Sequence, residues 1–238
     1  MPSTFSARST ARDERLLEGV IANMPMFRDV DCSGVGQIAS LARIQYCHPG
    51  ALIARQGEPL PGIIAVAYGL AKLALPRRKG DEKVLGFLGA NETFGAASVL
   101  LDRPCPLNIV ALTDSMLAVL PARPLLRLLE FDPKFARNLT KDLAGSVLGM
   151  VSEFEASVQC SAVQRLASYL GSLARPAQAA QGETVRLPAS KTQIAARIGI
   201  TKETMSRLLR GLAERGLISV SGREILILDR PGLAQIAA

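Results

Sequence analysis

Hydrophobic and polar positions change their pattern several times along this chain of 238 residues. The first fifteen residues are polar and predict a flexible N-terminal tail. Apolar residues then recur at helical spacing over residues 16–27, which predicts a helix that stops near Pro25. A second short helix is predicted over residues 31–43, with three inward-facing side chains: Val35, Ile38 and Leu41.

Between residues 44 and 120 the pattern changes to short runs of valine, isoleucine, leucine and alanine, separated by glycine and proline. Strands of this length and spacing are typical of a sandwich or a jelly roll. One of the breaks, residues 77–81, carries three basic side chains, and we interpret it as a solvated hairpin tip.

After Pro121 the pattern becomes helical again, and from Phe135 to Val158 apolar residues recur at steps of three or four. This is a seam of the coiled-coil type. Gly145 and Gly149 weaken the helix, so packing must hold it together, either against a second copy of the chain or wholly within one chain. We predict a dimer interface formed by Leu139, Leu143, Val147, Met150, Phe154 and Val158. The helix is expected to end at a hinge over residues 159–161, where a further helix through Leu173 begins.

Residues 190–217 predict two short helices joined by a tight turn. Ser190 and Gln193 have the spacing of a capping box at the start of a helix over residues 191–197. Gly199 supplies the permissive backbone of the turn, and Thr201 is a candidate N-cap of the second helix. A helix-turn-helix of this kind can read DNA, or it can be a simple packing unit.

The second helix has one apolar and one polar face. The apolar face, which must meet a core, consists of Met205, Leu208, Leu209 and Leu212. The polar face has the chemistry for reading the major groove, because arginine donates to guanine, glutamate accepts from cytosine and serine bonds either partner. We expect base contacts from Lys202, Glu203, Ser206 and Arg207, and phosphate contacts from Lys191, Thr192, Thr201, Thr204 and Arg210.

Two observations favour DNA as the partner. A β-hairpin is predicted after the second helix, with a turn at residues 221–222 between short apolar runs, which is the layout of a winged helix-turn-helix. Of the formal net charge of +7, most lies in residues 161–238, which hold eleven basic against five acidic residues. A positive charge gathered in one domain attracts the phosphate backbone of nucleic acid.

Composition and motifs argue against several other classes of protein. No apolar run is long enough for a membrane span and no signal peptide is present, so we expect a cytoplasmic protein. Cysteines 32, 47, 105 and 160 are far apart, which argues against a zinc finger or a disulfide scaffold. The sequence contains a single histidine and lacks a nucleophile elbow, a metal-ligand cluster and a glycine-rich phosphate loop, so an enzyme is not expected.

Taken in order, these elements resemble the CRP/FNR superfamily of bacterial transcription regulators. The matching residues are Pro49-Gly50, Gln56-Gly57-Glu58, Gly69, Lys72, Leu73, Lys191, Ile194, Ala195, Gly199, Glu203, Thr204, Ser206, Arg207, Leu208 and Leu217-Ile218. The resemblance implies an α+β chain: a tail over residues 1–15, a double-stranded β-helix (jelly-roll, cyclic-nucleotide-binding-like) sensor barrel over 16–132, a dimerisation helix over 133–160 and a winged helix-turn-helix over 161–238. It also implies double-stranded DNA, a second copy of the chain and RNA polymerase as partners.

The recognition helix is similar to that of the oxygen-responsive branch of the superfamily, in which a Glu-Thr-x-Ser-Arg run reads TTGAT. Glu203, Thr204, Ser206 and Arg207 occupy those positions, so the resemblance implies a palindrome like TTGAT-N4-ATCAA. Lys202 stands where a cyclic-AMP-responsive relative carries arginine, which favours the first type of operator. The segment from Gly222 to Arg230 is similar to the nitric-oxide-responsive, haem-linked subgroup called DNR-like.

The sensing site departs from the cyclic-nucleotide binders of the superfamily, which carry Gly-Glu-Leu followed by an Arg-Ser or Arg-Thr pair. Here the corresponding run is residues 94–98, FGAAS, and the later pair is Pro106-Leu107. Without the carboxylate and the guanidinium, a buried cyclic phosphate would lose its charge-assisted bonds. We therefore predict that neither cyclic AMP nor cyclic GMP is the signal.

The sequence offers several other hypotheses for the signal. Cysteine is absent before Cys32, which argues against the N-terminal iron-sulfur cluster of some relatives. His48 and Cys47 are weak candidates as haem ligands, and a surface histidine before Pro-Gly is the simpler interpretation. A thiol switch at Cys32, Cys105 or Cys160 is a further hypothesis, against four structural thiols. The alternative function is a haem or small-metabolite binding protein in which the winged unit is only a scaffold.

Overall fold

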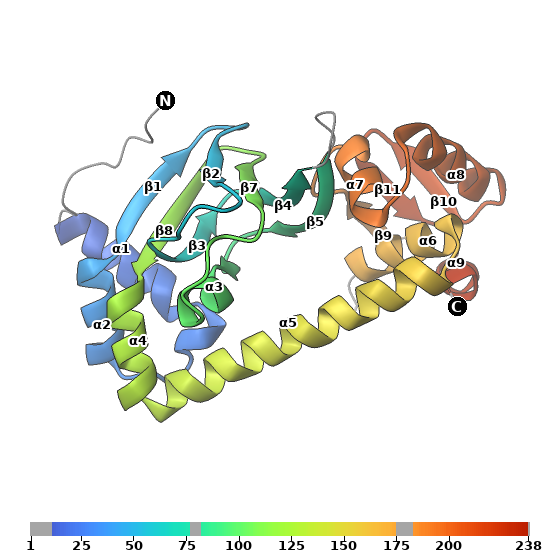
Figure 1. Cartoon of the computed structure of the whole chain (residues 1–238). Coiled ribbons are helices and arrows are strands. Elements are labelled where there is room, and N and C mark those ends of the chain that lie inside the picture. Colours follow the sequence, from blue (N-terminus) through green and yellow to red (C-terminus); the bar gives the residue numbers. More distant parts are fainter. Residues whose placement is uncertain (1–10, 77–81, 175–182, 238) are drawn as a thin grey trace. The chain divides into compact units, whose positions relative to one another are not determined.

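The computed structural model of the chain describes residues 11–76, 82–174 and 183–237 (Figure 1). The chain divides into two compact units, residues 1–81 with 85–148 and residues 82–84 with 149–238. The predicted hairpin tip at residues 77–81 lies outside the described residues. Among the described helices, none is both long and apolar enough to cross a membrane.

The first unit contains two four-stranded sheets whose observed pairs are antiparallel. One sheet has the order β1-β8-β3-β6 and the other has the order β2-β7-β4-β5. The strands span Arg43–Cys47 (β1), Leu52–Ala54 (β2), Gly62–Tyr68 (β3), Ala71–Pro76 (β4), Glu82–Leu88 (β5), Thr93–Phe94 (β6), Asn108–Ala111 (β7) and Ser115–Pro121 (β8). The strand spacing predicts a sandwich or a jelly roll, and the jelly-roll barrel that the resemblance implies is confirmed.

Strand β3 is buried on both of its faces. Because side chains alternate along a strand, Ile64 and Val66 enter the core between the sheets, while Ile63 and Ala65 enter a second core under helices. Strand β8 is divided in the same way: Leu117 belongs to the first core and Leu120 to the second. Burial on two sides explains why these strands are continuous apolar runs in the sequence.

Helices at both ends of the barrel sequence build the second core. They are α1 (Ala11–Ala22), a 3₁₀ turn over Pro25–Phe27, α2 (Cys32–Leu41), α4 (Ala122–Phe131) and the start of α5; the short α3 spans Ala96–Leu100. The structure corrects two predictions here. Helix α1 begins at Ala11, so the last five residues of the predicted tail are helical. Val35 and Ile38 are buried as predicted, but Leu41 is exposed because it is the last residue of α2.

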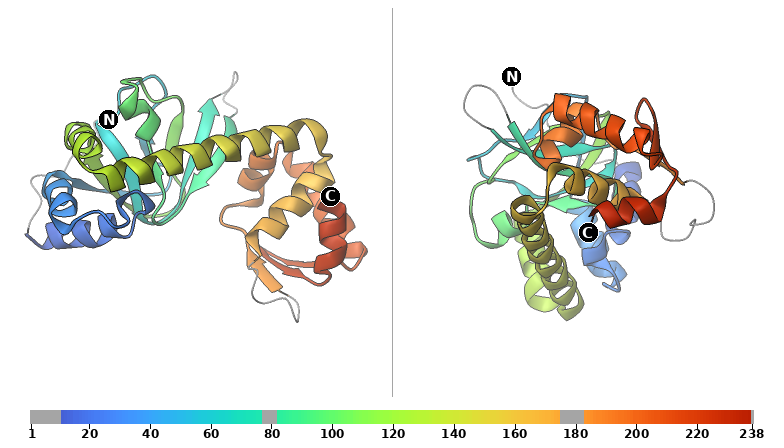
Figure 2. Two further views of the ribbon diagram at one scale, coloured as in Figure 1. Left: turned by 90° about the horizontal axis from the view of Figure 1, so that it is seen from below. Right: turned by 90° about the vertical axis from the view of Figure 1, so that its right-hand side faces the viewer.

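Helix α5 runs from Pro133 to Gln159, and both views in Figure 2 show it as one unbroken helix. Phe135 and Leu139 are buried in the helical core of the first unit, and Leu143 packs partly buried against it. The prediction that Leu139 forms a dimer interface is therefore wrong, because its own chain already covers it. The large apolar residues from Val147 to Val158 are exposed.

The second unit begins near the end of α5 and contains four helices and a three-stranded sheet among its described residues. The helices are α6 (Ala162–Leu173), α7 (Lys191–Ile198), α8 (Lys202–Glu214) and α9 (Arg230–Ala237). The sheet has the order β10-β11-β9, with strands Ile218–Ser221 (β10), Glu224–Ile227 (β11) and Glu183–Arg186 (β9). The predicted hairpin is β10–β11, whereas β9 as a third strand and α9 were not predicted.

Candidate nucleic-acid interface

The helix-turn-helix is fixed by local interactions at each helix end. At the start of α7, the Gln193 amide donates to Ser190 Oγ at 3.3 Å, and the Ser190 amide donates to Gln193 Oε1 at 3.0 Å. This reciprocal pair is the predicted capping box, and it satisfies two backbone donors that a helix start leaves free. Gly199 ends the helix with φ of +74°, a value that other residues adopt at a steric cost. The chain then turns directly into α8.

Helix α8 presents its two faces as the sequence predicts. Met205, Leu209 and Leu212 are buried, and Leu208 is half-buried, so the apolar face is covered by the unit's own core. On the opposite face the four predicted base-reading side chains are all exposed: Lys202, Glu203, Ser206 and Arg207. They lie within the first two turns of the helix, which is the part of a recognition helix that reaches base edges.

Two of the predicted phosphate contacts have roles in the structure itself. Thr201 is the N-cap of α8: its Oγ1 accepts from the Thr204 amide at 3.2 Å and donates to Thr204 Oγ1 at 3.0 Å. The Thr201 hydroxyl has only one proton to donate, and this proton is already used. Thr204 keeps a hydroxyl proton, so of the two side chains it is the better donor to a phosphate oxygen.

A surface cavity of about 200 Å³ brings the other predicted contacts together. Lys191 at the first turn of α7, and Ser206 and Arg210 on α8, supply its polar lining. Its apolar lining comes from Leu209, Ala213 and Val220, the last of which belongs to the hairpin. Two cations and a hydroxyl beside a helix N-terminus form a site with the chemistry of phosphate binding. Thr192 is exposed next to Lys191 and is not part of the cavity lining.

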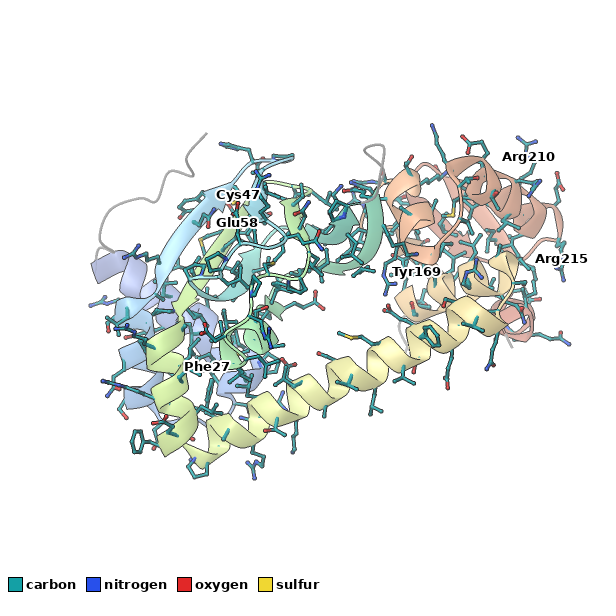
Figure 3. All side chains as sticks on the ribbon, in the orientation of Figure 1. Phe27, Cys47, Glu58, Tyr169, Arg210 and Arg215 are labelled. Atoms are coloured by element: carbon teal, nitrogen blue, oxygen red, sulfur yellow. The ribbon has the colours of Figure 1, made fainter. Side chains whose placement is uncertain are left out.

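The structure also presents basic residues that were not among the predicted contacts. Arg215 follows the end of α8, and Arg223 lies at the tip of the β10–β11 hairpin beside Gly222; both are exposed. Figure 3 shows Arg210 and Arg215 at the outer edge of this unit. The position of Arg223 next to the glycine of a predicted turn was the sequence signal that could have identified it.

The two haem-ligand candidates do not come together. Cys47 is buried in the core between the sheets, and burial raises the pKa of its thiol, while a hydrogen bond from Gln45 acts to lower it. The side chain of His48 is 93% exposed, and its Nδ1 lies 2.8 Å from Asp114 Oδ1. An exposed, paired imidazole and a buried thiol do not form one iron site, so the residues present do not fit haem at this place. Within the described residues, there is also no group of three His, Cys, Asp or Glu suited to holding a metal ion.

The structure also reduces the number of candidate cysteines for a thiol switch. Cys105 is buried, its Sγ donates to the carbonyl of Leu107 at 2.9 Å, and burial raises its pKa. A raised pKa lowers the fraction of reactive thiolate, which makes Cys105 a poor redox sensor and corrects its inclusion as a candidate. Cys32 is exposed and Cys160 is half-buried, so these two candidates remain accessible.

The positions of the cyclic-nucleotide cassette hold uncharged side chains. Ala96 and Ser98 of α3 are buried, and Ala96 packs into the helical core. Leu107, where a nucleotide binder carries the arginine or its partner, is buried in the core between the sheets. The barrel therefore lacks, at these positions, the carboxylate for a ribose and the guanidinium for a cyclic phosphate.

Two family models match this chain in the order of its units. One described as cyclic nucleotide-binding domain covers residues 44–132, and one described as Crp-like helix-turn-helix domain covers residues 164–236. The first match covers the barrel and the second covers the helix-turn-helix with its hairpin. The fold and the exposed face of α8 define a DNA-binding transcription regulator with a cyclic-nucleotide-binding-like domain.

The chain belongs to the CRP/FNR superfamily. It is 27% identical over 190 residues to transcriptional activator protein anr of Pseudomonas aeruginosa, covering 79% of this chain and 78% of that protein. It is 26% identical over 190 residues to the fumarate and nitrate reduction regulatory protein of Escherichia coli, covering 79% and 76%. The solved structure of FixK2 from Bradyrhizobium japonicum has the same fold, with a TM-score of 0.74 and 24% identity over 83% of this chain and 98% of that one.

Proposed function

We propose that the chain is a homodimeric, sequence-specific regulator that reads a palindrome like TTGAT-N4-ATCAA with one α8 in each half-site. The observation that carries this proposal is the face of α8: Glu203, Ser206 and Arg207 are exposed, while the opposite side of the helix is buried. Glutamate supplies an acceptor, serine supplies a hydroxyl that can donate or accept, and arginine supplies a bidentate donor. Together these groups can distinguish base pairs in the major groove. We further propose RNA polymerase as a partner, on the strength of the family.

The dimer is proposed to form through the second half of α5. Six large apolar side chains are exposed there: Val147, Leu148, Met150, Val151, Phe154 and Val158. Four of them, residues 147, 151, 154 and 158, follow the alternating four-three spacing of a coiled-coil seam. Fully burying a side chain of this size contributes about 1.5–3 kcal/mol, so pairing two such helices offers enough free energy to offset the cost of association. A two-fold dimer also matches the two-fold symmetry of a palindrome.

The base-reading and phosphate roles follow from the same geometry. Lys202, Glu203, Ser206 and Arg207 are proposed to contact bases, and phosphates are proposed to be held by Lys191, Thr192, Thr204 and Arg210, with Arg215 and Arg223 added from the structure. Thr201 is proposed to act as a cap rather than a contact. The signal is proposed to be something other than a cyclic nucleotide, because the barrel carries Ala96 and Leu107 where the binding groups would stand.

DNA binding under a salt titration tests the proposal. The full chain is titrated onto a fluorescent duplex carrying the palindrome and onto one in which both half-sites are scrambled. We expect preference for the palindrome by a factor of at least about 10³, and a steep fall of affinity with salt, since each neutralised phosphate contributes about 0.9 to the slope. Equal affinity for the two duplexes would refute sequence reading by α8. A flat salt dependence would refute phosphate binding altogether and would favour the scaffold alternative.

A further inference from the structure

Three helix ends of the second unit are joined by one guanidinium. Arg165, in the first turn of α6, donates from Nε to the carbonyl of Ile198 at 2.9 Å and from Nη1 to the carbonyl of Cys160 at 2.5 Å. Ile198 is the last residue of α7, and Cys160 follows the last residue of α5. Carbonyls at a helix end lack partners within the helix and carry the negative end of its dipole, so a cation is well placed there.

A second arginine connects the same two helices. Arg197, in the last turn of α7, forms an ion pair with Glu153 of α5. The side chain of Arg197 is only 24% exposed, whereas that of Glu153 is 51% exposed. An ion pair of this exposure contributes little to stability, because solvent screens it. Its clearest physical effect is to fix the distance and the angle between two helices.

Tyr169 of α6 completes this group. Burial raises the pKa of Tyr169 to about 12, while the positive charge of Arg197 acts in the opposite direction, which places the guanidinium near the phenol. Arg197 is thus paired with an acidic residue of α5, and its charge acts on a tyrosine of α6. In the view of Figure 3, Tyr169 lies apart from Arg210 and Arg215.

The position of α7 determines the position of α8. Ile194, Ala195 and Ile198 of α7 are buried, α7 packs against α8, and the turn at Gly199 between them is short. A displacement of the end of α7 relative to α5 would therefore move the recognition helix with it. In a dimer joined through α5, the two copies of α8 must lie about 34–36 Å apart to enter successive turns of the major groove.

We propose that Arg165 and Arg197 are positioning residues that hold the helix-turn-helix on the end of α5 and set the placement of α8 for the two half-sites, without touching DNA. This inference rests on the proposed function, namely binding by an α5-joined dimer. It differs from the usual role of arginine in a DNA-binding domain, which is to hold phosphate. The two arginines are instead bound to carbonyl and carboxylate groups of the protein itself.

Substitutions in the pair Arg197–Glu153 distinguish a positioning role from a phosphate contact. The two roles predict opposite changes in DNA affinity when Glu153 loses its charge. We compare four full-length proteins, the unsubstituted chain, Arg197→Gln, Glu153→Gln and the exchanged pair Glu153→Arg with Arg197→Glu, on the palindrome and on a duplex with one half-site. Removing the negative charge of Glu153 should tighten binding to a polyanion if only electrostatics acts. If the pair positions α8, Glu153→Gln should instead weaken binding to the palindrome, by roughly the same tenfold as Arg197→Gln. Without the ion pair, the placement of α8 is no longer fixed before binding, and ordering it on the DNA costs free energy.

The expected result is therefore a loss of palindrome affinity in both single variants, little change on the single half-site, and recovery in the exchanged pair. The salt slope should stay that of the unsubstituted protein, whereas Arg210→Gln, the matched control, should lower affinity on both duplexes and reduce the slope by about 0.9. Tighter binding by Glu153→Gln, or a slope reduced by about 0.9 in Arg197→Gln, would show that Arg197 is a phosphate contact and would overturn the proposal.

Amide hydrogen exchange without DNA provides the measurement that does not depend on the proposed function. Arg197→Gln and Glu153→Gln should both accelerate exchange in the last turns of α5 and α7, because they release the same contact. Unchanged exchange in both variants would overturn the positioning role. If the unsubstituted protein failed to distinguish the palindrome, the proposed function would fail, while exchange would still decide whether the pair holds the two helices together.

Discussion

Leu139 and Phe154 lie on the same helix, α5, but the first is 2% exposed and the second is 70% exposed. Leu139 packs with Phe135 in the helical core of the first unit, whereas Phe154 belongs to a row of apolar side chains that the described part of its own chain leaves open. One helix therefore has two functions along its length. Its first turns belong to the fold, and its last turns are proposed to bind a second copy.

Phe154→Glu should convert the protein to a monomer. The substitution places a carboxylate from each copy in the proposed seam, and an unpaired buried charge costs roughly 3 kcal/mol or more, which corresponds to at least about a hundredfold in dimer dissociation. Sedimentation velocity across a concentration series measures the change. The far-ultraviolet spectrum should remain that of the unsubstituted chain, because Phe154 makes no contribution to the core of its own chain.

Leu139→Ala is the matched control on the same helix. Its loss should destabilise the first unit by about 2–5 kcal/mol in urea unfolding, as expected for a leucine removed from a packed core. The dimer should persist wherever the protein remains folded. A monomeric but stable Leu139→Ala protein, or a dimeric Phe154→Glu protein, would contradict the division of α5 described above.

Arg207→Ala should relax sequence discrimination. The side chain is exposed on the second turn of α8, where its fork can bond guanine O6 and N7. We expect a loss on the order of 1–3 kcal/mol on the intact palindrome and a smaller penalty for replacing the guanine of each half-site. A titration against duplexes with single base-pair changes measures both. Retention of full discrimination at that guanine would assign its recognition to another residue.

Cyclic AMP should leave the stability of the protein unchanged. A ligand present at a hundred times its dissociation constant adds about 2.7 kcal/mol to the folded state, which thermal unfolding detects easily. With Ala96 and Leu107 buried where the binding groups would stand, we expect no shift of the unfolding temperature at millimolar cyclic AMP or cyclic GMP. A saturable rise with either nucleotide would show that the barrel binds the phosphate by another route.

The four thiols should react with iodoacetamide at distinct rates. Burial raises the pKa of Cys47 and of Cys105, so each carries less thiolate at a given pH below that pKa than an exposed cysteine does. We expect Cys32 to be modified first, Cys160 next, and the two buried thiols only after unfolding in urea, as read by mass spectrometry of peptides. Rapid labelling of Cys105 in the folded protein would restore it as a sensor candidate.

Sequence reasoning was most reliable where the structure depends on neighbours along the chain. The predicted capping box of Ser190 with Gln193 involves residues three apart, and the turn at Gly199 depends on one backbone angle. The two faces of α8 likewise follow from the period of a helix. For these elements the local pattern is sufficient, because the interactions that stabilise them are themselves local.

It was least reliable where the same pattern admits different partners. Leu139 and Phe154 share an apolar spacing, and periodicity shows that a side chain must be covered without showing what covers it. Strand β9 pairs with β11 across a long separation in sequence, which no local signal reports. The Arg197–Glu153 pair joins residues that are 44 positions apart, so no local pattern in the sequence indicates it.

The double burial of β3 has a mechanical consequence for any effector of the barrel. Ile64 and Val66 face the core between the sheets, and Ile63 and Ala65, adjacent to them on the same backbone, face the core that holds Phe135 in the first turn of α5. Interiors packed this densely deform little, so a change of volume on one side of the strand is passed to the other. A molecule bound inside the barrel would thus displace β3, and β3 would pass that displacement directly to the first turns of α5.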